Sequence, residues 1–260
     1  MEEENSPVNL RISAYAVSSL TRAALSDGTK RVSWVIVDSD GETVCQADQY
    51  VEDTGFGTLT APLDYGTYTL YTVAHSQSVS CSLSKEGMAT FGETKITDTF
   101  CRARTFTLEK DGKDTLHIYM PRAVAKFTMR CTDAIPGNAD YLTFTFRPAG
   151  SVLSVATGLA AADVQTTQKR IIVIPAANLG KANASFSFYT FLSADEATLT
   201  VTATCYDESD VKLYEHTFTN VPLQINHQTT YTGEFFKVGT DIGGTLYVIN
   251  EWGDEKIFEF

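Results

Sequence analysis

Residues 115–135 read TLHIYMPRAVAKFTMRCTDAI, and this stretch decides how the chain is divided. Apolar and polar residues alternate on both sides of Pro121, with the two-residue period of half-buried β-strands. Proline cannot donate a hydrogen bond to a central β-ladder, so Pro121 predicts the end of one strand and the start of the next. Strand-rich sequence flanks it on both sides. We therefore predict one domain over residues 1–121 and a second over residues 122–260.

Short alternating segments of this kind fill both halves of the chain and are separated by turn residues. None keeps a helical period over ten residues or more, which favours antiparallel, Greek-key-type β-sandwiches over an α/β arrangement. Asp111-Gly112 is the strongest hairpin signal. The sequence predicts a loop with room for one helical turn at residues 18–30. It predicts a long loop or irregular segment at residues 76–97, and a long surface loop or a short helix at residues 147–169. The fold class we predict is all-β, with two tandem sandwiches.

The chain is acidic, with 20 Lys and Arg against 32 Asp and Glu, a net charge of −12 and an isoelectric point near 4.7. Its positive charges are scattered along the sequence. A phosphate backbone or an anionic lipid surface needs a basic footprint, so the charge argues against nucleic acid or membrane lipid as the main partner. No run approaches the roughly 20 apolar residues of a membrane-spanning helix.

No group of residues marks a catalytic, cofactor or metal site, and we predict a protein that is not an enzyme and that needs neither cofactor nor metal. The five cysteines form no CxxC pair. Several lie in apolar alternation and are predicted to be small buried hydrophobes, with a Cys131–Cys205 bridge left open. The four histidines show no metal-ligand spacing. Trp34 and Trp252 lie in apolar alternation, which favours core packing over a ligand platform.

Residues 119–136, YMPRAVAKFTMRCTDAIP, resemble the junction segment of the fimbrillin-A-associated anchor protein family, which supplies anchor, tip and minor subunits of type V pili. Those proteins carry a similar Arg-x-Val-Ala-Lys core followed by a strand and a proline turn. The resemblance covers most of the chain from about Tyr65, and Gly66-x-Tyr68 resembles the start of a strand in transthyretin-like domains. Further matches fall in the expected order: Asp98, Phe100, Val221, Pro222, Leu223, Asn226, Thr229, Thr230, Tyr231, Gly233 and Trp252.

The resemblance implies a non-catalytic, surface-exposed fimbrial component, built from two transthyretin-like sandwiches, that acts in fimbria assembly and cell adhesion. Other fimbrillin subunits would be its partners, together with a host or bacterial surface ligand. Such proteins are lipoproteins of the outer membrane, attached through an N-terminal cysteine. We expect that a leader and this cysteine preceded residues 2–4, which are three glutamates here.

In stalk subunits of this family, an N-terminal strand is removed after an arginine, and the next subunit fills the groove by strand addition. The corresponding exchangeable strand in this sequence would present Val8, Leu10, Ile12, Ala14 and Ala16. Arg22 is then the candidate site of proteolytic processing. The alternative is that Arg22 is an ordinary loop arginine.

Several roles remain open from the sequence. It does not separate anchor, tip and stalk subunits, although the lack of a long extension beyond Trp252 favours an anchor or a tip. The alternative function is a carbohydrate-binding or glycan-processing β-sandwich, which as an enzyme would show paired carboxylates about 5–10 Å apart in a groove. A β-sandwich of unrelated role is the third hypothesis.

Overall fold

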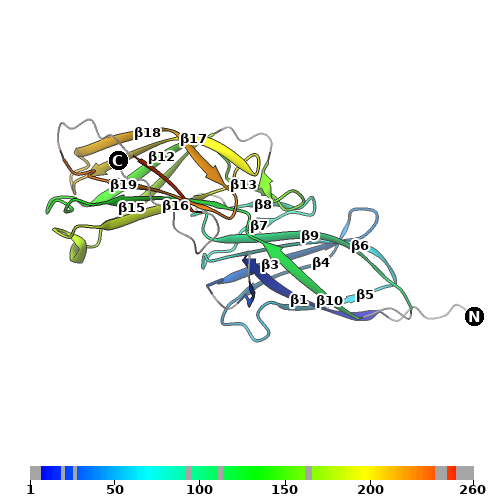
Figure 1. Cartoon of the computed structure of the whole chain (residues 1–260). Helices are drawn as coiled ribbons and strands as arrows, with labels where there is room; N and C mark the ends of the chain where they lie inside the picture. The colour runs from blue at the N-terminus through cyan, green and yellow to red at the C-terminus, as the bar shows by residue number, and fades with distance from the viewer. Residues whose placement is uncertain are drawn as a thin grey trace, which may run out of the picture. The chain divides into compact units, whose positions relative to one another are not determined.

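The structure, a computed structural model, describes residues 7–18, 21–25, 28–91, 95–110, 114–161, 166–237 and 245–249 (Figure 1). The regular secondary structure of these residues is β-strand, apart from a single 3-10 turn, η1 (Ala176–Asn178). The predicted all-β fold is confirmed. The predicted turn at Asp111-Gly112 and the predicted strand position of Trp252 lie outside the described residues.

The chain divides into two compact units. Unit 1 combines Met1–Ala123 with Val152–Ala161, and unit 2 combines Val124–Ser151 with Ala162–Phe260. The short segment Val152–Ala161 thus belongs to unit 1 although it follows Pro121 in the sequence. A division between independently folding domains at residues 121 and 122 stays a prediction.

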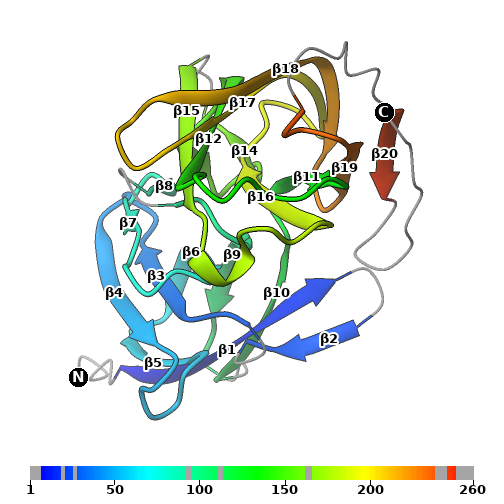
Figure 2. The ribbon, with the colours of Figure 1, turned by 90° about the vertical axis from the view of Figure 1, so that its left-hand side faces the viewer.

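The first sheet of unit 1 is built around β1 (Val8–Ser18). β1 pairs in parallel with β10 (Thr115–Pro121), and in the antiparallel sense with β5 (Thr58–Leu63) and β2 (Thr21–Ala24) (Figure 2). The parallel pair departs from the purely antiparallel sheets that we predicted. Parallel neighbours need a long crossover, and here the whole second sheet lies between β1 and β10 in the sequence.

Two further sheets complete unit 1. The second sheet is antiparallel, with the order β4-β3-β6-β9, and its strands are β3 (Arg31–Val37), β4 (Thr43–Tyr50), β6 (Gly66–His75) and β9 (Thr99–Leu108). The third is small, with the order β14-β13-β8-β7, and its strands are β7 (Ser82–Leu83), β8 (Met88–Thr90), β13 (Val152–Ser154) and β14 (Leu159–Ala160).

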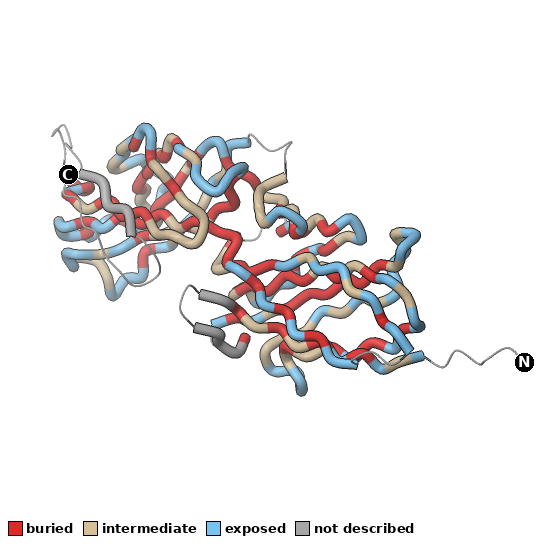
Figure 3. The backbone as a smooth tube through the Cα atoms, turned by 45° about the vertical axis from the view of Figure 1, so that its right-hand side comes forward, coloured by how far each residue is buried: buried red, intermediate tan, exposed pale blue. Residues whose placement is uncertain are grey.

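The core of unit 1 is shared by the first two sheets, which makes them a β-sandwich. The backbone changes repeatedly between buried and exposed along these strands (Figure 3). Leu10 and Ile12 of β1 belong to the same apolar cluster as Trp34 and Ile36 of β3. Trp34 is fully buried, so the prediction that it packs in a core is confirmed. Burial of such large side chains is the main force that holds the two sheets together.

The third sheet and its flanking residues cover the outer face of the second sheet. Phe91 packs edge-to-face on the ring of His75, with 5.3 Å between centroids. The thiol of Cys81 donates a hydrogen bond to Ser33 Oγ at 3.8 Å. Phe91, Cys81 and Leu153 are all buried. Unit 1 is therefore a sandwich with a third, partial layer.

Three predicted loops are wrong in part, because each contains short strands. Residues 18–30 include β2, residues 76–97 include β7 and β8, and residues 147–169 include β13, β14 and the start of β15 (Thr166–Val173). The strands β2, β7, β8, β13 and β14 have only two to four residues, which is too short for a period of two to stand out in a polar sequence.

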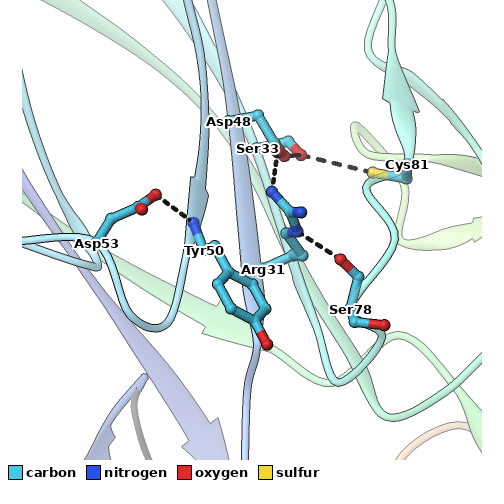
Figure 4. A network of polar contacts seen from close by, with 7 residues as sticks. All are labelled: Arg31, Ser33, Asp48, Tyr50, Asp53, Ser78 and Cys81. Atoms are coloured by element: carbon cyan, nitrogen blue, oxygen red, sulfur yellow. Dashed lines mark hydrogen bonds and ion pairs between the residues drawn. The ribbon is translucent and has the colours of Figure 1, made fainter.

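A network of polar contacts ties the chain that leaves β6 to the second sheet (Figure 4). Arg31 donates from Nη1 to Asp48 Oδ2 at 2.8 Å and from Nε to the carbonyl oxygen of Ser78 at 2.7 Å. Ser33 Oγ donates to Asp48 Oδ1 at 2.7 Å, and the Arg31 guanidinium lies 4.8 Å from the centroid of the Tyr50 ring. These bonds fix the route by which the chain reaches the third sheet.

The buried imidazole of His75 makes the stability of unit 1 depend on pH. Burial lowers its pKa to about 4; nearby Asp48 opposes this shift and Arg31 adds to it. An unfolded histidine binds its proton near pH 6.5, so unfolding takes up a proton between these values and becomes easier as the pH falls. We expect the free energy of unfolding to drop by about 3 kcal/mol between about pH 6.5 and pH 4 through this group.

Urea unfolding at a series of pH values measures this effect. The variant His75→Gln should show a smaller loss over the same range, since the carboxylates that also titrate there are common to both proteins. Equal pH slopes for the two proteins would contradict the assignment.

Unit 2 is a sandwich of two 4-stranded sheets, with the orders β16-β11-β19-β20 and β15-β12-β17-β18. The first contains β11 (Ala125–Cys131), β16 (Ala184–Thr190), β19 (Gln228–Gly233) and β20 (Thr245–Ile249). The second contains β12 (Tyr141–Ala149), β15, β17 (Glu196–Tyr206) and β18 (Lys212–Gln224). β11 and β19 form a second parallel pair.

Aromatic rings fill the core of unit 2. The ring of Phe127 lies 5.1 to 5.8 Å, between centroids, from those of Phe144, Phe188, Phe218 and Tyr231. Phe127 contributes from β11 in one sheet, whereas Phe144 and Phe218 come from the other sheet. This cluster joins the two layers.

Four of the five cysteines are buried, as predicted, and Cys45 is half-buried. Cys131 and Cys205 both lie in the core of unit 2 and are free thiols. Burial raises the pKa of Cys205 to about 11 and that of Cys131 well above its usual value. Thiols held protonated in this way are poor nucleophiles.

Candidate strand-exchange site

The sequence-predicted exchangeable strand is β1, and one face of it is apolar and buried. Leu10, Ile12, Ala14 and Ala16 are each 9% exposed or less, and Val8 is half-buried. These residues occupy alternate positions, as a period of two requires. That β1 exchanges with another strand stays a prediction.

β1 occupies a central position in its sheet, which determines what its removal would expose. Its register pairs Ile12 with Leu116 of β10 and with Leu59 of β5. Both partner residues are buried and belong to the same apolar cluster. Without β1, two backbone edges would lose their hydrogen-bond partner and the cluster would face water. Such a groove would accept an extended chain with apolar residues at every second position.

Arg22 lies in β2, the strand that pairs directly with the end of β1. The register places Arg22 opposite Val17 and Thr21 opposite Ser18. Proteases bind extended chains that are not already paired, so cleavage at Arg22 would require β2 to separate from β1 first. Processing at Arg22 stays a prediction.

Arg122, Asp98 and Phe100, which carried part of the sequence resemblance, come together in unit 1. Arg122 Nε donates to Asp98 Oδ1 at 2.5 Å, and Nη2 donates to Oδ2 at 2.9 Å. The guanidinium lies 4.8 Å from the centroid of Phe100. Arg122 is only 7% exposed, so the bidentate pair compensates the removal of a charge from water. The role of this motif is to hold the chain that follows β10.

The later motif residues meet at the start of β11 in unit 2. Asn226 adopts a left-handed φ of 62°, and its N–H donates to the carbonyl oxygen of Val124 at 2.9 Å. The N–H of Lys126 donates to the carbonyl oxygen of His227 at 3.0 Å. Thr229 Oγ1 donates to the carbonyl oxygen of Pro222 at 2.7 Å. The second motif is therefore a structural turn that aligns β11 with β19.

A surface pocket of about 500 Å³ lies where β17 begins and β18 ends. The residues that line it include a single carboxylate, that of Glu196: the lining is Glu196, Ala197, Thr198, Pro222, Leu223 and Gln224. Glycoside hydrolysis uses two carboxyl groups, and this pocket offers one.

Within the described ranges, no three His, Cys, Asp or Glu side chains are grouped so that they could hold a metal ion. The same part of the chain contains no helix of the length and hydrophobicity needed to cross a bilayer.

Residues 58–256 match the sequence profile of a family of unknown function, DUF6562. The chain belongs to the DUF6562 family. No curated protein matches the sequence. The family assignment fits the geometry above, because the matched range includes both structural motifs of this DUF6562 protein.

Solved structures share the fold of this DUF6562 protein. A candidate adhesin from Bacteroides ovatus has a TM-score of 0.60 at 12% identity, with 96% of each chain covered. A candidate polysaccharide-binding protein (DUF1812) from Bacteroides thetaiotaomicron has a TM-score of 0.57 at 8% identity, with 95% of this chain and 99% of that chain covered. The neighbours also include the fimbrial anchor protein Mfa2 from Porphyromonas gingivalis, with a TM-score of 0.49 at 12% identity and with 96% of this chain and 100% of that chain covered. At these identities the likeness to the first two structures shows a shared fold.

Proposed function

We propose that this protein is a non-catalytic component of a fimbria, exposed at the cell surface, that assembles with other fimbrial subunits by β-strand addition at the site of β1. The observation that carries this proposal is the placement of β1. It is a central strand with one face that is apolar from Val8 to Ala16, and it is joined by a short hairpin to the strand that contains Arg22.

The comparisons with solved structures also support an adhesion role. The candidate adhesin is covered over 96% of its length, so the likeness extends over both units rather than one module. A candidate cell adhesion protein from Bacteroides ovatus has a TM-score of 0.52 with 98% of each chain covered. We infer an anchor, tip or minor subunit that is attached to the outer membrane through a lipid and that contacts other subunits through sheet edges.

Strand exchange at β1 can be tested with purified protein. A site for a sequence-specific protease replaces Thr21–Ala24, the chain is cut there, and a fluorescent peptide of residues 8–18 is added. We expect the peptide to replace the native strand, because the groove offers two backbone edges and an apolar floor. A peptide with Ile12→Asp serves as the matched control and should not be taken up. A cut chain that retains its strand and takes up neither peptide would rule out exchange at this site.

A further inference from the structure

The outer face of β1 and β10 presents three aromatic rings, of which Tyr15 contacts the other two. Tyr15 of β1 stacks on Tyr119 of β10, with 5.4 Å between centroids and 26° between planes. Tyr15 also contacts His117, with 5.9 Å between centroids. Tyr119 is 37% exposed, His117 is exposed and Tyr15 is half-buried. These three residues form the aromatic strip, and it faces away from the core of unit 1.

Polar and cationic groups border the aromatic strip. Arg11 lies on the same face of β1, four residues before Tyr15; it is exposed and lies opposite the exposed Thr115. Ser13 lies opposite His117. At the edge of β10 that faces away from β1, Arg104 Nη1 of β9 donates to the carbonyl oxygen of His117 at 2.9 Å, which keeps a second guanidinium beside the strip.

The charge of this surface differs from that of the whole chain. The chain carries a net charge of −12, whereas two guanidinium groups flank the strip. Among the described residues, Asp114 places a carboxylate at its end, where Oδ1 accepts a hydrogen bond from Thr115 Oγ1 at 3.2 Å. A polyanion is repelled by most of an acidic protein and attracted to a local basic surface. The electrostatics of the strip therefore fit an anionic ligand.

The arrangement of groups indicates the class of that ligand. Aromatic faces attract the weakly positive C–H groups of sugar rings through their quadrupole. Arginine binds carboxylates with paired N–H donors, and hydroxyl groups such as those of Ser13 and Thr115 exchange hydrogen bonds with sugar hydroxyls. We propose that the aromatic strip, with Arg11 and Arg104, binds an acidic polysaccharide that contains uronic acid residues.

This inference goes beyond the proposed assembly role, since assembly uses the buried face of β1 and glycan binding uses its outer face. Loss of β1 by processing would also remove Arg11, Ser13 and Tyr15. Binding would then belong to subunits that retain their first strand. The test uses the uncleaved chain without any fimbrial partner. An absence of glycan binding would therefore leave the proposal of strand exchange unaffected, and an absence of strand exchange would leave the proposal of glycan binding unaffected.

The test is calorimetric titration of the full chain with tetragalacturonate, with the methyl ester of the same tetramer as the neutral probe. We expect binding of the acid form, weakened by added salt, and at least tenfold weaker binding of the ester. Arg11→Gln should weaken binding of the acid about tenfold, because a charge-assisted bond is lost. Tyr15→Ala should weaken it about fivefold.

The matched control is Tyr206→Ala in unit 2. Tyr206 stacks on Tyr141 with 5.0 Å between centroids, and the hydroxyl of Tyr141 donates to Asp210 Oδ1 at 2.7 Å. This pair has similar rings with acidic neighbours, and its loss should leave the affinity unchanged. Hydrogen exchange of the wild-type chain locates the binding site without any substitution. The acid tetramer should slow amide exchange in Val8–Ser18 and Thr115–Pro121.

Three results of the titrations would overturn the proposal. They are an absence of binding at millimolar tetragalacturonate, equal affinity for the acid and the ester, and equal affinity of the wild type and both strip variants. Protection by the tetramer that is confined to unit 2 would overturn it as well.

Discussion

Ile12→Asp is expected to abolish the folding of unit 1. Ile12 is fully buried at the centre of β1 and belongs to the cluster that joins the two sheets. An aspartate there would lose the apolar contacts and bring an unpaired carboxylate out of water, and the two effects together exceed about 5 kcal/mol. A domain of this size is stable by only about 5–15 kcal/mol. Hydrogen exchange monitored by mass spectrometry should show loss of protection in β3, β6 and β10.

Ser13→Asp is the control for this prediction, because Ser13 is the next residue on the same strand and lies on the outer face. We expect this change to alter the free energy of unfolding by less than about 1 kcal/mol. Similar effects of the two aspartates would mean that the register of β1 differs from the one described. This pair of variants therefore tests the placement on which strand exchange depends.

The sequence predicted the parts of the fold in which a period of two runs over many residues. Val8–Ala16 is an example, since alternation reports directly which side chains face the core. It could not predict that β1 lies beside β10 in the parallel sense. Strand pairing is decided by the packing of elements that are about a hundred residues apart, and alternation has the same form in parallel and antiparallel neighbours.

The third sheet of unit 1 was missed for a related reason. β13 pairs with β8 across more than sixty residues of sequence, and each strand has three residues.

The outward-facing aromatic strip also carried no sequence signal. Tyr15 and Tyr119 are unremarkable one by one, and only the parallel pairing of their strands brings them together. The ion pair of Arg122 and Asp98 could have been predicted, because both residues belong to the motifs that carry the family resemblance.

In unit 2, Phe127→Ala should cause the largest loss of stability of any single truncation to alanine. Phe127 is fully buried and its ring contacts four other aromatic rings from both sheets. Truncation removes the largest apolar surface at the centre of the cluster and leaves a cavity that the surrounding rings cannot fill without leaving their preferred rotamers. We expect a loss of about 3–5 kcal/mol in the free energy of unfolding. Phe127→Leu should lose less, since it leaves a smaller cavity.

Tyr189→Ala is the matched control for this variant. Tyr189 follows Phe188 on β16 but is half-buried, and its ring lies 5.7 Å from Lys126 Nζ. An exposed cation–π contact contributes about 0.5–1 kcal/mol, so this loss should remain near 1 kcal/mol. Urea unfolding, monitored by hydrogen exchange in β12 and β17, measures the loss of stability of each variant. If both lost the same stability, the sheets of unit 2 would have to be held together by something other than the aromatic cluster around Phe127.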